Sequence, residues 1–201
     1  MAGIKEGVTA LVDLSGLGSD DQKRLACVIS RRAAREYRRL FQKDPARWLL
    51  LPQLLITIEE AHEFLDPDPE KRTFFSNIAL TYRKYHVGLC VVTPRPSRID
   101  PDVFAELWTK IIMKTAFKRD RSYLVENTPH LEYSEVEIKI LDKGEALLVS
   151  EPQIRFAVPI KTIYYPEYLS NKDAIDYSLP ASSPLERTDE LIKKLKEVAS
   201  K

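Results

Sequence analysis

Two adjacent carboxylates, Glu59 and Glu60, directly follow an apolar run of strand length at residues 54–58. An unpaired charge is strongly unfavourable in an apolar interior, so acids are expected at the end of a buried strand and not within it. In open α/β sheets, the carboxyl ends of the strands are where ligands bind. One carboxylate there can hold Mg²⁺ through water, and the next can orient an attacking water, which is the chemistry of a Walker B segment. The alternative is a core strand followed by a turn with solvated acids.

Strands and helices are expected to alternate along the chain. Apolar runs predict strands at 8–14, 54–58, 87–93 and 110–114, and helical periodicity predicts helices at about 20–43, 69–85, 119–127 and 132–141. The pairs Asp68-Pro69 and Asp100-Pro101 are typical of helix starts. Two apolar runs at 145–149 and 154–158 predict a hairpin. This order indicates the α/β class, with a mostly parallel sheet flanked by helices and a terminal antiparallel hairpin.

The carboxyl ends of two predicted strands would meet at one edge of a parallel sheet. Glu59 and Glu60 follow the first of these strands, and Thr93 and Arg95 lie at the end of the other. One helix separates the two strands, so these side chains are expected to line a common site. Metal coordination by Glu59, Glu60 and His62 is a weaker interpretation, because adjacent residues of a strand point to opposite faces.

Composition limits the kinds of protein that this chain can be. Its 201 residues carry a formal net charge of +1, so any contact with nucleic acid must come from a local patch. No apolar run reaches the roughly 18–20 residues of a membrane span, and a signal-peptide pattern is absent, which predicts a cytoplasmic protein without a membrane partner. Cys27 and Cys90 are interpreted as reduced core thiols. The 30% of charged residues points toward a thermophile.

One predicted helix, at 20–43, has a basic face. Its arginines at positions 24, 31, 35 and 38 lie opposite the apolar residues. They could contact phosphate or a neighbouring subunit, but a solvated face is the simpler interpretation.

Several ordered segments resemble the HerA family of archaeal and bacterial hexameric DNA translocases, which are close to FtsK. The segments that carry the resemblance are 12–17, 58–64, 83–89, 94–100, 120–123 and 144–147. Together they span roughly residues 8–160. Several motifs in the right order and at plausible spacing are much more specific than any one of them.

The resemblance implies a RecA-like, P-loop NTPase core that assembles as a homo-oligomeric, hexameric ring around double-stranded DNA, with ATP between subunits. Glu59 is then expected to bind the Mg²⁺ of the cofactor through water, and Glu60 to activate the attacking water. Arg83 and Arg95 complete the expected catalytic set. Arg83 would stabilise phosphoryl charge in trans, and Arg95 matches the family's Gln-Arg-Pro loop. The family's partner in DNA end processing is a NurA-type nuclease.

The sequence departs from the family where the phosphates would bind. No Gly-x-x-x-x-Gly-Lys-Ser/Thr occurs, so these residues include no P-loop nest. The family's sensor glutamine before Arg-Pro is Pro94 here, and the segment 80–82 replaces the arginine and glycine expected before Arg83. ATP and Mg²⁺ would therefore require a P-loop from elsewhere, and the chain is not expected to hydrolyse ATP alone.

Two explanations fit these departures. In the first, residues 1–163 are the carboxyl-terminal part of a RecA-like ATPase domain whose Walker A strand and helix lie upstream. Residues 164–201 are then a surface tail with a short amphipathic helix that carries Leu191, Leu195 and Val198. In the second, the chain is a degenerate, non-hydrolysing HerA-like module that serves in oligomer assembly or partner docking. The retained pair Glu59-Glu60 has no obvious use without ATP, which favours the first explanation.

Overall fold

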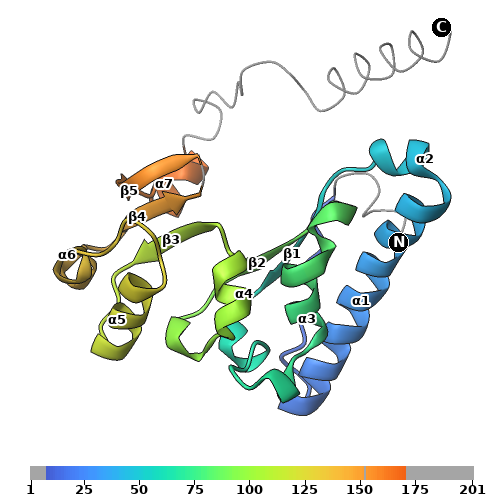
Figure 1. The fold of residues 1–201 in the computed structure, drawn as a ribbon, viewed down its shortest axis with the longest axis horizontal. Coiled ribbons are helices and arrows are strands. Elements are labelled where there is room, and N and C mark those ends of the chain that lie inside the picture. The colour runs from blue at the N-terminus through green and yellow to red at the C-terminus, as the bar shows by residue number, and fades with distance from the viewer. Residues whose placement is uncertain (1–7, 152, 171–201) are drawn as a thin grey trace, which may run out of the picture.

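The computed structural model describes residues 8–151 and 153–170, in which helices flank two small sheets (Figure 1). The helices are α1 (Ser19–Lys43), α2 (Pro45–Leu49), α3 (Phe74–Asn77), α4 (Pro101–Glu106), α5 (Lys118–Glu126), α6 (Glu135–Ile140) and α7 (Tyr165–Ser170). The strands are β1 (Leu54–Ile58), β2 (Val87–Val91), β3 (Thr109–Met113), β4 (Glu145–Ser150) and β5 (Ile154–Lys161).

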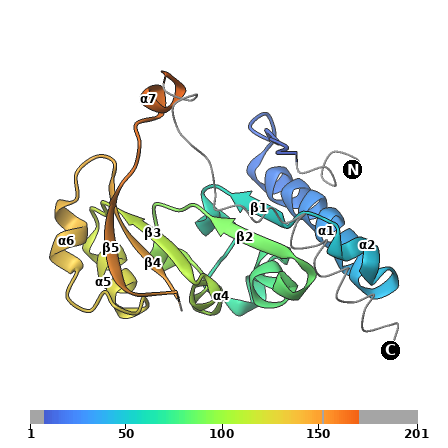
Figure 2. The ribbon, with the colours of Figure 1, turned by 90° about the horizontal axis from the view of Figure 1, so that it is seen from above.

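The described strands form one parallel and one antiparallel sheet. β1 and β2 pair in parallel, with Leu54 opposite Val87 and Ile58 opposite Val91. β3, β4 and β5 form an antiparallel sheet in that order, at the other end of the molecule from α1 (Figure 2). The α/β class and the terminal hairpin are thus confirmed. The strand expected at 110–114 is present as β3, and its ladder partner is the hairpin strand β4.

One hydrophobic core extends from the contact of α1 with α3 to the antiparallel sheet, where Ile112 and Leu147 belong to it. The apolar face of α1 is buried there, including Ala34 and Tyr37. Two aromatic side chains then fix the starts of the parallel strands. The Tyr37 hydroxyl donates a hydrogen bond to the Pro52 carbonyl at 2.9 Å, and the Trp48 ring N–H donates to the Tyr85 carbonyl at 3.1 Å. These bonds tie the residue stretches just before β1 and β2 to α1 and α2, and so position the starts of both strands.

The strand expected at 8–14 does not form. These residues have no regular structure, and Val8, Leu11 and Val12 are exposed, Leu11 to 95%. A strand is stable only when a neighbouring strand satisfies its backbone groups. Within the described residues no strand pairs with this segment. Apolar content alone therefore predicted an element that its surroundings do not support.

The single helix expected at 69–85 is instead four short helical turns. Pro69–Lys71 is a 3-10 turn, α3 follows, Ile78–Tyr82 is a π turn, and Arg83–Tyr85 is again 3-10. A π turn accommodates one extra residue in a helix. Although the α-helix is interrupted here, the apolar face predicted for residues 69–85 is still buried. The members of this face are Phe74, Ile78, Tyr82 and Tyr85.

His86 should make stability depend on pH. It lies in the left-handed region, at φ 62°, and its ring stacks on Trp48 with centroids 3.9 Å apart. Burial lowers the pKa of His86 below its ordinary value of 6.5. As pH falls below that value, the unfolded chain therefore takes up the proton before the folded chain does, and stability is lost.

The variant His86→Asn tests this effect, because asparagine tolerates positive φ and does not titrate here. Denaturant unfolding between pH 7 and pH 5 should show a shallower fall in the free energy of unfolding for the variant than for the wild type. Other groups titrate equally in both proteins, so parallel curves would contradict the prediction.

No helix in the described part of the chain is long and apolar enough to span a membrane. Cys27 and Cys90 are both free thiols. The predicted amphipathic helix with Leu191, Leu195 and Val198 falls outside the described residues.

Candidate functional site

The carboxyl edge of the parallel pair brings Glu59 and Glu60 together with the chain that follows β2. Backbone bonds continue beyond the strands. The Val92 N–H donates to the Ile58 carbonyl at 2.9 Å, and the Ala61 N–H donates to the Val92 carbonyl at 3.0 Å. The two strand ends are therefore held side by side, as expected for a shared site.

Glu60 turns the chain sharply out of β1. Its backbone is left-handed, at φ 47° and ψ 42°, and its side chain is 66% exposed. A residue with a side chain rarely adopts this conformation, and such residues are concentrated at functional sites. Because the turn breaks the alternation of the strand, Glu59 and Glu60 are both exposed at this edge. Both carboxylates are therefore accessible from solvent.

His62 connects the two strand ends, a role that the sequence did not predict. Its Nδ1 lies 3.3 Å from the Thr93 hydroxyl oxygen and 3.5 Å from Glu60 Oε2. Its Nε2 lies 3.6 Å from Glu63 Oε1, and the side chain is only 10% exposed. The imidazole, which is largely shielded from solvent, thus lies between Thr93 and the exposed carboxylate of Glu60. The described residues hold no cluster of three ligands suited to a metal, so the alternative site of Glu59, Glu60 and His62 is not assembled.

Arg95 lies at the same edge, in the loop after β2. Its backbone N–H donates to the Thr93 hydroxyl oxygen at 3.1 Å. Its guanidinium carbon lies 5.8 Å from the centre of the exposed Phe117 ring. The loop is anchored from α5, because buried Asp120 accepts the Ser97 N–H at 3.1 Å.

Arg121, next to Asp120, anchors the chain after β3. Its guanidinium is buried and donates to the carbonyls of Thr115, at 3.0 Å, and Ala116. The segment 120–123 therefore positions two loops from one helix. Its effect on the candidate site is therefore indirect, because it binds the backbone of these loops.

Asp120→Ala should loosen the loop that carries Arg95. The variant leaves the Ser97 N–H without its acceptor, which should lower the free energy of unfolding by about 1–3 kcal/mol. Hydrogen exchange of the Ser97 amide should be faster than in the wild type. Asp120→Asn keeps an acceptor oxygen and should show a smaller change. Unchanged exchange at Ser97 in the alanine variant would contradict this account.

Arg83 is not part of this edge. It precedes β2, so it lies at the amino end of the parallel pair, and a five-residue strand is about 16 Å long. Its guanidinium carbon lies 4.4 Å from the centre of the Trp108 ring. It lines an open surface hollow with Lys84, His86 and Glu106. Within one chain, Arg83 and Glu60 are therefore separated, and only a second subunit could unite them.

The residues present fit Mg²⁺ better than they fit phosphate. Two exposed carboxylates, Glu59 and Glu60, supply the oxygen ligands that Mg²⁺ prefers. The glycine turn at 15–18 leads into α1, but the first turn of that helix holds Asp20 and Asp21. Acids at a helix amino terminus repel the anion that a P-loop would bind there. Phosphate-binding groups would have to come from outside the described residues.

Comparison with known proteins gives a consistent group of relatives, although no family model matches the chain. The DNA double-strand break repair helicase HerA of Saccharolobus solfataricus is 30% identical over 151 residues, or 74% of this chain and 30% of that protein. HerA of Sulfurisphaera tokodaii is 32% identical over 155 residues, 73% of this chain and 30% of that protein. HerA of Pyrococcus furiosus is 29% identical over 177 residues, 75% of this chain and 32% of that protein. The chain therefore spans about a third of the length of these relatives.

Similarity to a solved structure supports the fold, but not the function. That structure is B204, the DNA-packaging ATPase from Sulfolobus Turreted Icosahedral Virus, which matches with a TM-score of 0.50 and 14% identity. The match covers 59% of this chain and 56% of that one.

Proposed function

Because this chain is a HerA-like sequence over about three quarters of its length, we propose that it is part of an ATP-driven translocase of double-stranded DNA. It would contribute the Walker B segment and the sensor loop. The observation that carries the proposal is the joined carboxyl edge of β1 and β2. There the exposed carboxylates Glu59 and Glu60 lie beside Thr93 and the loop of Arg95.

Each residue of the edge has a distinct proposed task. Glu59 would hold Mg²⁺ through water, and Glu60 would orient the water that attacks the phosphate. Mg²⁺-bound ATP, when present, supplies the phosphoryl group and neutralises part of its charge. His62 and Thr93 would fix the direction of the Glu60 carboxylate, since His62 contacts both. Arg95, exposed in its loop, offers a positive charge at the same edge.

The position of Arg83 supports a homo-oligomer. It is exposed at the end of the parallel pair opposite to Glu60, so it could reach a Glu60 edge only on a second copy. An arginine supplied by a neighbour can stabilise the charge of phosphoryl transfer. We propose a hexameric ring on this basis and on the resemblance to HerA. Residues 1–163 would be the carboxyl-terminal part of the ATPase domain, with 164–201 as its tail, and a NurA-type nuclease remains the expected partner.

A second candidate is a HerA-like module that has lost hydrolysis and serves in assembly or docking. Pro94 favours it, because proline has no side-chain donor at the position of the family's sensor glutamine. The acids in the first turn of α1 also favour it, since they oppose phosphate binding.

The mass of the protein purified from its native source separates the two candidates. A mass well above 23.1 kDa, with peptides that contain a Gly-Lys-Ser or Gly-Lys-Thr loop, is expected for the translocase. That protein should hydrolyse ATP, and duplex DNA should stimulate the hydrolysis. A native mass of 23.1 kDa without hydrolysis would overturn the first proposal in favour of the second.

A further inference from the structure

Positive charge in this chain is concentrated on α1. The helix has eight basic residues and three acidic ones, whereas the whole chain has a formal net charge of only +1. The rest of the chain is therefore net negative. The basic residues of α1 are Lys23, Arg24, Arg31, Arg32, Arg35, Arg38, Arg39 and Lys43.

Part of this charge lines an open groove on the helix. The residues that line the groove are Val28, Arg31, Arg32, Arg35, Glu36 and Arg39. All four of these arginines are exposed. Figure 1 shows α1 as an outer element of the molecule, on the side away from the antiparallel sheet. The groove is therefore accessible from solvent along the middle of the helix.

Contacts hold several of these side chains in place. Arg39 donates two hydrogen bonds to Glu36, at 2.8 and 2.9 Å, and the Arg31 guanidinium carbon lies 5.3 Å from the centre of the Phe74 ring. Arg31, Arg35 and Arg39 are spaced by four residues, or about 6 Å of helix rise at each step. The result is a row of guanidinium groups along one side of the helix, with Arg32 beside it.

We propose that this groove binds the phosphate backbone of double-stranded DNA. The inference deepens the proposed function and rests on it for the identity of the polyanion. Guanidinium groups bind phosphate oxygens in a bidentate manner, and regularly spaced cations can follow a strand of phosphates. Such contacts position a duplex without reading its sequence.

The composition of the groove favours DNA over a second protein chain. Protein interfaces are depleted of charge at their centres, whereas protein–DNA interfaces are strongly positive. The groove has four arginines, one glutamate and one apolar residue. It is therefore more typical of a nucleic-acid contact.

The amino-terminal part of α1 also reaches the candidate site. Lys23 forms an ion pair with Glu63 at 2.9 Å, and Glu63 contacts His62. The groove lies on a different side of α1 from Lys23, so the helix itself stands between a bound duplex and the edge that holds Glu60. DNA binding and the catalytic carboxylate would be linked through one helix.

The test measures binding of the full 201-residue chain to a fluorescently labelled 30-base-pair duplex over a series of salt concentrations. The variant replaces three groove arginines: Arg31→Gln, Arg32→Gln and Arg35→Gln. The control removes the same charge from exposed residues elsewhere: Lys139→Gln, Lys143→Gln and Lys161→Gln. We expect the groove variant to bind roughly 10- to 100-fold more weakly at low salt. The slope of log K against log salt should become shallower by about 2–3. The control should stay close to wild type.

Each other outcome overturns the inference. These outcomes are a wild type that does not bind duplex, equal losses in the groove and control variants, and a groove variant that loses self-association but not DNA binding. Thermal unfolding of both variants checks that they fold. If the triple variant does not fold, Arg32→Gln with Arg35→Gln tests the same point, because neither residue lies over an aromatic ring. If the protein from the native source binds DNA through the groove but does not hydrolyse ATP, the proposed function is overturned and this inference stands.

Discussion

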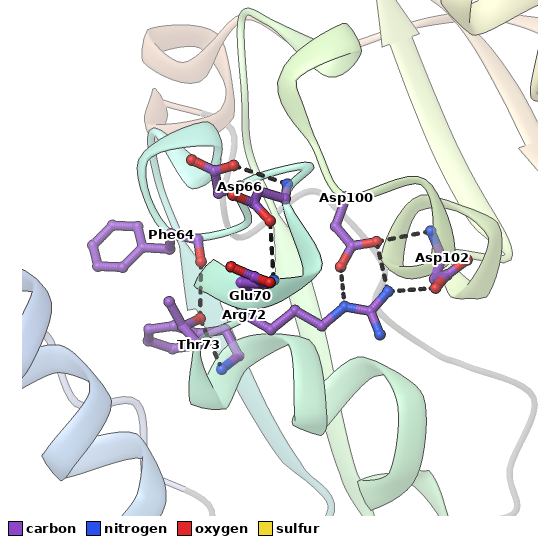
Figure 3. A network of polar contacts seen from close by, with 9 residues as sticks. Phe64, Asp66, Glu70, Arg72, Thr73, Asp100 and Asp102 are labelled. Atoms are coloured by element: carbon purple, nitrogen blue, oxygen red, sulfur yellow. Dashed lines mark hydrogen bonds and ion pairs between the residues drawn. The ribbon is translucent and has the colours of Figure 1, made fainter.

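Asp100→Ala should lower the free energy of unfolding by about 3 kcal/mol, because it removes a buried carboxylate that accepts three hydrogen bonds. Asp100 is 1% exposed and begins α4. Its two oxygens accept from Arg72 at 2.6 and 3.2 Å, and one of them also accepts the Asp102 N–H at 3.0 Å. Figure 3 shows Arg72 reaching across to this carboxylate from the turn before α3. Asp100 and Asp102 together raise the pKa of Arg72 above its ordinary value.

Asp102→Ala provides the control for Asp100→Ala. Asp102 contacts the same guanidinium, but its side chain is 69% exposed, so its ion pair is screened by water. Its removal should change the free energy of unfolding by less than about 1 kcal/mol. Urea unfolding of both variants, followed by circular dichroism, measures the difference. Equal effects in the two variants would show that burial of Asp100 is not what stabilises the contact.

Glu60→Gln should reduce the rate of ATP hydrolysis at least about 100-fold, in the native protein that contains this chain and a P-loop. Glutamine keeps the shape of the side chain but cannot accept a proton or hold a water as strongly as a carboxylate. ATP binding should change little, since the charge lost lies at the water and not at the phosphates. The measurement is steady-state hydrolysis at saturating ATP and duplex DNA.

Glu63→Gln is the matched control for hydrolysis. It removes the same charge three residues away, and its wild-type contacts are Lys23 and His62. The pKa of Glu63 is lowered mainly by its hydrogen bond from Lys23, so the residue is ionised in the wild type as Glu60 is proposed to be. We expect near wild-type hydrolysis from Glu63→Gln. A hundredfold loss in this variant, or none in Glu60→Gln, would remove Glu60 from the catalytic role.

The sequence predicted the strands and helix starts around the candidate site, because these elements depend on local pattern. The apolar runs before Glu59 and up to Thr93 correctly predicted two parallel strands. A strand and the polar residues that end it can be recognised from a few neighbouring residues. The helix starts at Asp68-Pro69 and Asp100-Pro101 were also confirmed. Each aspartate accepts the backbone N–H two residues later, at 3.0 Å.

Contacts between distant residues left no such pattern. Arg72 and Asp100 are 28 residues apart, and no local sequence pattern indicates that they form a pair. The sequence indicates no role for His62 beyond that of a metal ligand, since its contact with Thr93 depends on how the two strand ends are joined. The π turn at Ile78–Tyr82 also could not be anticipated, because one inserted residue scarcely disturbs the apolar periodicity.

The open edge of β1 has a practical consequence for work with the chain by itself. Among the described residues, β1 pairs only with β2, so its other side presents unpaired backbone groups. Its five residues include neither a charge nor a proline, and Leu55 is 63% exposed. Such an edge invites strand addition between molecules and then aggregation. Concentrated samples should become turbid on storage, and a lysine in place of Leu55 is the natural way to keep them dispersed.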